Sequence, residues 1–379
     1  YESQPLPIRW PRARYASDKG SHAYVLTRKG IEQVLQQNNI PQPSYGMYYD
    51  QNAFRDTISL KQTMENLRTG NNATPKNPFP ALDNEPIIPG NLLYLDVDTS
   101  KVDWKKLNSK PKSRMIVNLG NSSVVYRHQL MLLEMLTNIN DDNWERPVYF
   151  AATVDRGLYA PVENNLIVEG ITYRVTPGEP LSKGVNTEIA YDNMMNKFRW
   201  GGVDEDPNIY LDVTSRNMIY TFRMYFSQLI AALIEEGKND MALAALDKCI
   251  AVMPDQAAPF RTEGLIFARN YLQLGEKEKG TDLIVSILDR INKNLSWYDR
   301  LSPVQIANSW IDISRNNLDP LLMIADIYQV FDHQKYITLV DDLLKRAQFY
   351  YGTGVYPLGD DILKELTNSS LRSYYGSSN

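Results

Sequence analysis

The sequence is poor in the residue types that most often carry out chemistry. Among its 379 residues there is one cysteine, Cys249, and there are three histidines, His22, His128 and His333. A single cysteine excludes a disulfide framework within the chain. The histidines stand far apart, without cysteine or aspartate at the spacing of a zinc site, so we expect no metal and no cofactor. Cys249 occupies an apolar helix position and is expected to pack rather than to react.

Other absences exclude further classes of protein. No apolar run approaches the roughly 18 residues of a membrane-spanning helix. The net charge of −5 and the pI near 5.4 argue against a nucleic-acid partner, because no basic stripe is present to neutralise phosphates. No nucleophile-elbow, dinucleotide-binding or phosphate-loop motif occurs. Since the chain begins at Tyr1, without Met or a signal peptide, we expect a mature form or an excised fragment.

The first part of the chain combines irregular segments with short helices. Residues 1–20 are rich in Pro and Arg and predict an extended arm, and residues 71–91 hold five prolines and predict a long loop. Between them, residues 30–39 and 57–70 predict short amphipathic helices. The apolar face of the second helix consists of Leu60, Met64 and Leu67.

Strand patterns follow and then disappear. Short aliphatic stretches predict strands at residues 92–98, 114–120, 148–154 and 170–177, with a helix at 125–140. Such apolar strands around a helix indicate a small mixed sheet covered by helices, with parallel pairing across helix 125–140. From about residue 205 only helical periodicity remains. We therefore expect an α/β or α+β domain with an extended arm at residues 1–204 and an all-α domain at residues 205–379.

A repeat pattern marks the start of the second domain. Residues 226–254 match the spacing of the tetratricopeptide helix-turn-helix at Phe226, Leu229, Leu233, Gly237, Ala242, Leu246, Cys249 and Pro254. Phe260 recurs 34 residues after Phe226, whereas Gly275 and Gly280 come about four residues late, which predicts a longer first helix. A third hairpin at residues 321–347 matches loosely. The pattern predicts tetratricopeptide-like helical hairpins with a concave surface for a protein segment, and an irregular helical bundle is the alternative.

Carboxylates are the main remaining candidates for a site. Asp96 and Asp98 come at the end of the strand "LLYLDVD", where open α/β sheets often place ligands, but a simple turn after the strand is favoured over a site. Asp204 and Asp206 lie in "VDEDPNIYLD", which could supply oxygen ligands to calcium but lacks the spacing of an EF-hand. A solvated turn that caps the next helix is favoured there. A hydrolase that uses Asp96 or Asp204 is the least favoured interpretation.

The segment "NDDNWERPVYFAATV", residues 140–154, allows two interpretations. Trp144, Glu145 and Arg146 could stand at the mouth of a cleft, or they could only start a central strand. Pro147 lacks an amide hydrogen, an exposed Glu145–Arg146 pair would contribute about 0–1 kcal/mol, and Trp144 would close the end of the core. We favour the fixed start of a strand and keep these three residues, together with Trp200, as ligand or interface candidates.

Four stretches occur together in one order: residues 140–154, "NNLIVEGITYRVTP", "YDNMMNKFRWGGVDEDPNIYLD" and residues 226–254. On these stretches the chain resembles the soluble C-terminal region of a bacterial family of large polytopic membrane proteins, labelled as a domain of unknown function. That family looks like GT-C-type glycosyltransferases, and its animal relatives act as protein O-mannosyltransferases. The resemblance is best over residues 110–290.

The resemblance implies a supporting role for this chain. The activating carboxylates would lie in a membrane-embedded half upstream of Tyr1, so no catalytic residue is carried over. The chain would be a non-catalytic accessory domain on the periplasmic side of the inner membrane, tethered by upstream transmembrane helices. Its partners would be its own N-terminal transmembrane catalytic region and an acceptor polypeptide. The alternative is a free-standing periplasmic or outer-membrane protein that binds glycans or peptides with tetratricopeptide-like helices.

Overall fold

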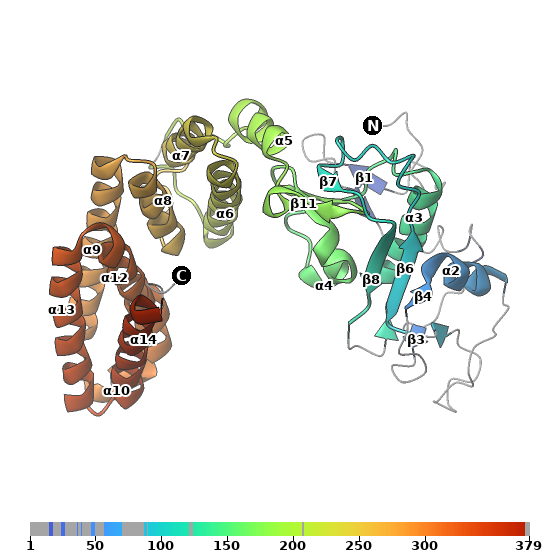
Figure 1. Ribbon diagram of the computed structural model, residues 1–379. Helices are drawn as coiled ribbons and strands as arrows, with labels where there is room; N and C mark the ends of the chain where they lie inside the picture. Colours follow the sequence, from blue (N-terminus) through green and yellow to red (C-terminus); the bar gives the residue numbers. More distant parts are fainter. Residues whose placement is uncertain are drawn as a thin grey trace. The chain divides into compact units, whose positions relative to one another are not determined.

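The chain divides into two compact units, Tyr1–Phe198 and Arg199–Asn379, which we call the N-terminal unit and the helical unit. The computed structural model describes residues 15–17, 24–26, 36, 39, 47–49, 57–69, 87–88, 90–120, 124–206 and 208–375. Small sheets occupy the N-terminal unit and helices the other, which is the fold class that the sequence predicts (Figure 1). No helix of the described part is long and apolar enough to cross a membrane.

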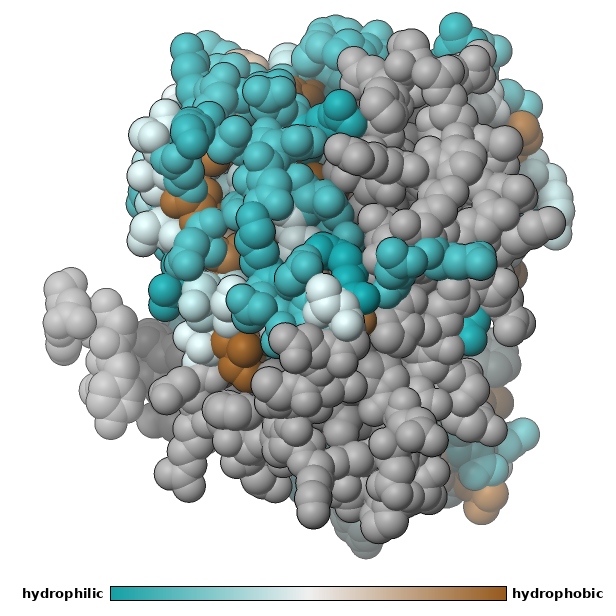
Figure 2. Space-filling model, turned by 90° about the vertical axis from the view of Figure 1, so that its right-hand side faces the viewer, coloured by the Kyte–Doolittle hydropathy of each residue, from teal (hydrophilic) through white to brown (hydrophobic). Residues whose placement is uncertain are grey.

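A mixed three-stranded sheet organises the core of the N-terminal unit. Its central strand β6 (Leu92–Asp96) pairs in parallel with β4 (Ile58–Ser59) and antiparallel with β8 (Arg114–Asn118). Alternate residues of β6 and β8 are buried, as the period of two along a strand requires. They share one hydrophobic core with α2 (Leu60–Thr69) and α3 (Arg127–Asp141). On the face that Figure 2 presents, the described residues are mainly hydrophilic.

Both helices of this core follow from local sequence. In α2 the predicted apolar face is buried, and the Ser59 hydroxyl accepts a hydrogen bond from the amide of Gln62 at 3.3 Å, which caps the helix. In α3 the buried residues include Leu130, Leu133 and Leu136. Most of the predicted arm at residues 1–20, helix at 30–39 and loop at 71–91 lies outside the described residues.

A second sheet corrects two predictions. Its antiparallel strands lie in the order β10 (Tyr149–Ala151), β12 (Thr172–Val175), β11 (Leu166–Val168). The prediction of a buried strand at residues 148–154 is wrong, because β10 spans three residues, all half-buried, at the edge of this described sheet. Parallel pairing across helix 125–140 is also wrong. The strands β8, before α3, and β10, after it, belong to different sheets, where β8 pairs antiparallel with β6 and β10 pairs antiparallel with β12.

Short elements complete the described part of the N-terminal unit. The remaining strands are β1 (Tyr15–Ser17), β2 (Tyr24–Leu26), β3 (Met47–Tyr49), β5 (Ile87–Ile88), β7 (Ser109–Lys110), β9 (Val124–Val125) and β13 (Glu179–Pro180). The helices are α4 (Arg156–Tyr159) and α5 (Thr187–Asp192), and α5 continues into the π-helical turn η5 (Asn193–Lys197). Because β12 lies between β10 and β11, the turn at residues 169–171, which joins β11 to β12, lies next to β10.

The helical unit is built from successive helices that pack against one another. They are α6 (Val213–Glu235), α7 (Asn239–Val252), α8 (Thr262–Gln273), α9 (Lys277–Tyr298), α10 (Pro303–Asn308), α11 (Trp310–Ile313), α12 (Asp319–Phe331), α13 (His333–Gly352) and α14 (Tyr356–Tyr375). Hairpins form from α6 and α7, α8 and α9, and α12 and α13 (Figure 1). Hairpins are therefore present in each of the three regions where the sequence predicts them.

The apolar positions of the predicted repeat are buried in the helical unit. The buried ones are Phe226, Leu229, Leu233, Ala242, Leu246 and Cys249. Gly237 turns the chain between α6 and α7 with a φ of +73°. In the second hairpin, α8 ends at Gln273, 13 residues after Phe260, whereas α6 ends at Glu235, nine residues after Phe226. The interval from the repeated phenylalanine to the end of the helix is thus four residues longer in the second hairpin, but the helix itself is not longer. Because α8 has 12 residues and α6 has 23, the prediction of a longer first helix is wrong.

Candidate functional site

Asp96 and Asp98 form local contacts at the end of β6. Asp96 pairs with Arg114 at 3.1 Å, and the Arg114 guanidinium lies 3.9 Å from the centre of the Tyr94 ring. Asp98 accepts a hydrogen bond from the Ser100 hydroxyl at 2.6 Å and pairs with Lys101 at 3.0 Å. These contacts lower the pKa of Asp98 to about 2, and the hydrogen bond from the Ser100 hydroxyl is the largest cause. Both carboxylates are exposed. Asp98 fixes the turn that follows the strand, whereas Asp96 pairs across the sheet with its partner in β8.

The Trp144 segment joins the end of α3 to the sheet. Asn143 and Trp144 both have positive φ, 54° and 62°, and redirect the chain after the helix. The Trp144 indole donates a hydrogen bond to the side-chain oxygen of Asn140 at 3.0 Å. The side-chain nitrogen of Asn140 in turn donates to the backbone oxygen of Asp96 at 2.9 Å. Trp144 is buried in the core, and Glu145 is exposed. The segment therefore closes the core, and Asn140 connects two of the candidates.

The other candidates lie at the start of the helical unit. The Trp200 ring packs against Phe222 and Phe226, with ring centres 5.8 and 5.7 Å away. Asp204 and Asp206 are exposed. Asp212, rather than either of them, caps α6 by accepting a hydrogen bond from the Ser215 amide at 2.7 Å. Among the described residues, no group of three His, Cys, Asp or Glu side chains is placed to hold a metal ion.

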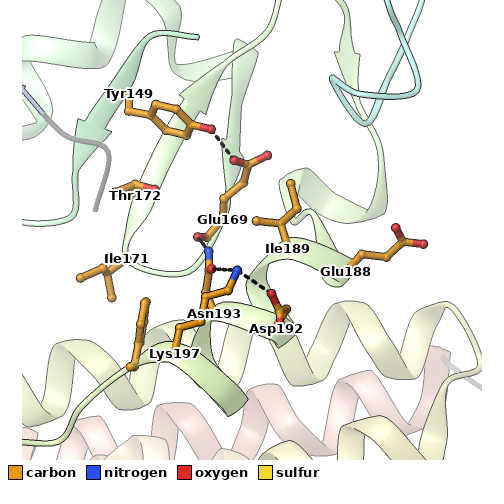
Figure 3. Close-up of a pocket in the computed structure, with 10 residues that line it drawn as sticks. Tyr149, Glu169, Ile171, Thr172, Glu188, Ile189, Asp192, Asn193 and Lys197 are labelled. Carbon is orange, nitrogen blue, oxygen red and sulfur yellow. Dashed lines mark hydrogen bonds and ion pairs between the residues drawn. The ribbon is translucent and has the colours of Figure 1, made fainter. Parts of the chain in front are cut away.

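A pocket of about 340 Å³ opens in the N-terminal unit, and none of these candidates lines it. Tyr149 comes from β10, Glu169 and Ile171 from the turn between β11 and β12, and Ile189 and Asp192 from α5. Figure 3 shows these side chains around one space, with the turn on one side and the helix on the other. The volume is at the lower end of the range for small-ligand sites, roughly 300–1,000 Å³.

Glu169 is the centre of a hydrogen-bond network at this pocket. Only 5% of the residue is exposed. One carboxylate oxygen accepts from the Tyr149 hydroxyl at 2.7 Å, and the other accepts from Arg174 at 3.2 Å and from the Asn186 amide at 3.0 Å. The Asn193 side chain donates to the backbone oxygen of Glu169 at 3.0 Å (Figure 3). A buried carboxylate needs such partners to offset its lost hydration, so the network holds the pocket in shape.

A second charged group sits at the helix side of the pocket. The Lys197 ammonium pairs with Asp192 at 2.5 Å and donates to the Asn193 side-chain oxygen at 3.2 Å (Figure 3). The Asn196 amide donates to Asp192 at 3.0 Å. The pKa of Asp192 is lowered, mainly by the hydrogen bond from Asn196 and then by the one from Lys197. This carboxylate is therefore ionised at neutral pH.

Gly170 and Phe198 form an apolar contact at the edge of the pocket. The φ of Gly170 is +104°, and a Cβ atom there would lie 2.9 Å from Cζ of Phe198. A side chain at this position therefore meets both a strained backbone and the ring. Only glycine lets the β11–β12 turn approach Phe198 this closely.

We expect Gly170→Ala to destabilise the N-terminal unit by more than about 1 kcal/mol, since alanine at a positive φ is strained, and to displace Phe198. Urea unfolding measures the loss. Gly120→Ala is the matched control, because Gly120 has a φ of +77° and no atom lies within 4 Å of an added Cβ. Equal losses in the two variants would contradict the contact with Phe198.

The chemistry of this pocket favours recognition over reaction. The oxygens of Glu169 already accept hydrogen bonds from three side chains. Asp192 has a lowered pKa, whereas an efficient general base has a pKa near the working pH. The mixture of apolar and charged groups suits a ligand that is apolar along its length and polar at its end.

The sequence does not predict this pocket. Tyr149, Glu169 and Asn193 are far apart in sequence. The antiparallel pairing of β10 with β12 places Tyr149 near the β11–β12 turn that carries Glu169, and η5, which follows α5, contributes Asn193. One signal was available: Glu169 interrupts the apolar run "LIVEGITY", and a charged residue in such a run is seldom buried without partners.

Comparison with known proteins gives one match. A family model described as TMEM260-associated domain 2 matches residues 1–193, just over half of the chain. Its last residue, Asn193, lies at the pocket. No curated protein and no solved structure matches the chain.

Proposed function

The chain belongs to the TMEM260-associated domain 2 family, and on this premise we propose that it is a non-catalytic accessory domain of a membrane-bound glycosyltransferase. The observation that carries the proposal is the family match over residues 1–193, whose description associates the domain with a TMEM260 protein. The resemblance of the four ordered stretches supplies the finer statement, a GT-C-type enzyme similar to protein O-mannosyltransferases.

The two units take different parts in this proposal. The pocket next to Glu169 supports recognition, since its carboxylates are engaged by hydrogen bonds and ion pairs. In the helical unit, the buried positions of the first hairpin support a tetratricopeptide-like array that contacts the acceptor polypeptide or the membrane-embedded half. The chain would act on the periplasmic side of the inner membrane, tethered by transmembrane helices upstream of Tyr1.

Reconstitution tests this function. The natural gene product is placed in lipid vesicles with and without residues 1–379, and transfer from a lipid-linked sugar to a protein acceptor is measured. We expect at least about a tenfold fall when the region is removed, equivalent to about 1.4 kcal/mol of acceptor recognition. The isolated chain should not turn over the donor.

Two results would contradict the proposal. One is turnover of a sugar donor by the isolated chain, and the other is unchanged transfer after removal of residues 1–379. A gene product with a lipidated cysteine and without upstream hydrophobic spans would favour the free-standing binding protein instead.

A further inference from the structure

The pocket next to Glu169 has more negative than positive groups in its lining. Glu169, Glu188 and Asp192 are acidic, and Lys197 is basic. The charge of Glu169 is offset by Arg174 at 3.2 Å, and that of Asp192 by Lys197. Glu188 is exposed and makes no ion pair with any described residue. One carboxylate at the rim is therefore available to an incoming cation.

Apolar side chains accompany this charge. Ile171, Ile189 and Phe198 line the same pocket, and Ile189 is 37% exposed. In Figure 3, Ile171 and Ile189 lie on opposite sides of the space, and Glu188 lies next to Ile189. An anion would be repelled by the excess carboxylate. A wholly apolar group would reduce the hydration of Glu188 without giving this carboxylate a partner.

A basic side chain satisfies both requirements. Its methylene stem packs against apolar surface while its charged head reaches a carboxylate. Lys197 already shows how this site holds an ammonium group, between the Asp192 carboxylate and the Asn193 side-chain oxygen. The size of the pocket, about 340 Å³, suits a single side chain better than a large cofactor.

From the cavity, its apolar walls and its unpaired rim carboxylate, we infer that this pocket binds a lysine or arginine side chain of a partner polypeptide. The inference deepens the proposed function and rests on it only in taking the partner to be a polypeptide. Glu188 receives the cation, Ile171 and Ile189 hold its stem, and Lys197 limits its affinity by competing for Asp192.

Saturation-transfer NMR on the complete 379-residue chain tests the inference. The probe is Nα-acetyl-lysine N-methylamide, and the neutral comparison is the norleucine analogue, which keeps the stem and lacks the ammonium. We expect saturation transfer to the lysine probe and weaker transfer to the norleucine probe. Binding of the lysine probe should weaken with added salt, since exposed charges are screened.

Two variants with opposite expected effects sharpen the test. Glu188→Gln should weaken binding of the lysine probe about threefold, and Lys197→Gln should strengthen it about threefold, the size typical of exposed ion pairs. Glu145→Gln is the control, because Glu145 is an exposed carboxylate of the same unit that does not line the pocket. The Glu145→Gln variant should bind the lysine probe with the same affinity as the unchanged chain.

Each contrary result has a definite meaning. The inference is overturned if the lysine probe shows no transfer, if norleucine binds equally well, or if both pocket variants bind like the unchanged chain. Displacement of the lysine probe by a methyl hexopyranoside at equal concentration would identify a sugar site instead. Because the test uses the chain alone, its failure is distinguishable from failure of the vesicle experiment, which would leave the probe's affinity unaffected.

Discussion

Replacing Arg223 with Met is expected to destabilise the helical unit by about 3–5 kcal/mol, because it removes one partner of a buried ion pair. Arg223 is fully buried and donates a hydrogen bond to Glu263, also buried, at 3.1 Å. Its other terminal nitrogen donates to the backbone oxygens of Met253, Pro254 and Ala258 at 2.7, 3.1 and 2.7 Å. The substitution leaves the Glu263 carboxylate without its counter-ion, although the Arg261 amide still donates to it at 3.2 Å, and it leaves these backbone oxygens without their donor.

The position of Arg223 explains the expected size of the effect. It extends from α6 of the first hairpin to Glu263 of α8 in the second, and to the segment that joins the hairpins. One guanidinium thus connects α6 to a carboxylate of the second hairpin and to the backbone between the hairpins, with the fork of donors that only arginine offers. Burial lowers the pKa of Arg223, and Glu263 raises it in compensation.

Urea unfolding followed by helical circular dichroism measures the loss. The informative comparison is the double variant Arg223→Met with Glu263→Gln, in which no charge is left unpaired. We expect the double variant to lose less stability than the sum of the single variants, as coupled partners do. A single Arg223→Met variant as stable as the unchanged chain would show that the pair does not stabilise the packing of the hairpins.

The parts of the fold that the sequence predicts are those set by local spacing. Leu60, Met64 and Leu67 recur with the period of a helix, and the structure buries all three in α2. The repeat around Phe226 and Phe260 likewise locates α6 to α9, because each hairpin carries its own packing positions. In both cases the information lies within a few turns of chain.

Pairing between strands could not be predicted in this way. The stretch at residues 148–154 is apolar, but its neighbour in the sheet is β12, more than 20 residues later in the chain. Two consecutive positive φ values, at Asn143 and Trp144, turn the chain away from a parallel crossover. Asparagine tolerates that conformation, whereas tryptophan gives no hint of it. The candidate pocket depends on the same distant pairing, and for this reason its residues were missed.

The network around Glu169 is where the second large effect is expected. Glu169→Ala should destabilise the N-terminal unit by about 3–5 kcal/mol, since Arg174, 3% exposed, would remain buried without its carboxylate. Tyr149 and Asn186 would lose an acceptor as well. The Nε atom of Arg174 already has no hydrogen-bond partner among the described residues. Without Glu169 the guanidinium would keep its bond to the backbone oxygen of Lys106 at 3.1 Å but would have lost its counter-ion.

Hydrogen exchange read out by mass spectrometry localises this effect. In Glu169→Ala, amides of β10, β12 and α5 should exchange faster, because the carboxylate connects these three elements, while amides of α6 to α9 should not change. Glu169→Gln keeps the shape and one acceptor oxygen, so it should lose less, about 1–3 kcal/mol. If the alanine variant exchanged like the unchanged chain, Glu169 would not hold the pocket together. If the glutamine variant were as unstable as alanine, the charge rather than the acceptor geometry would be what the network requires.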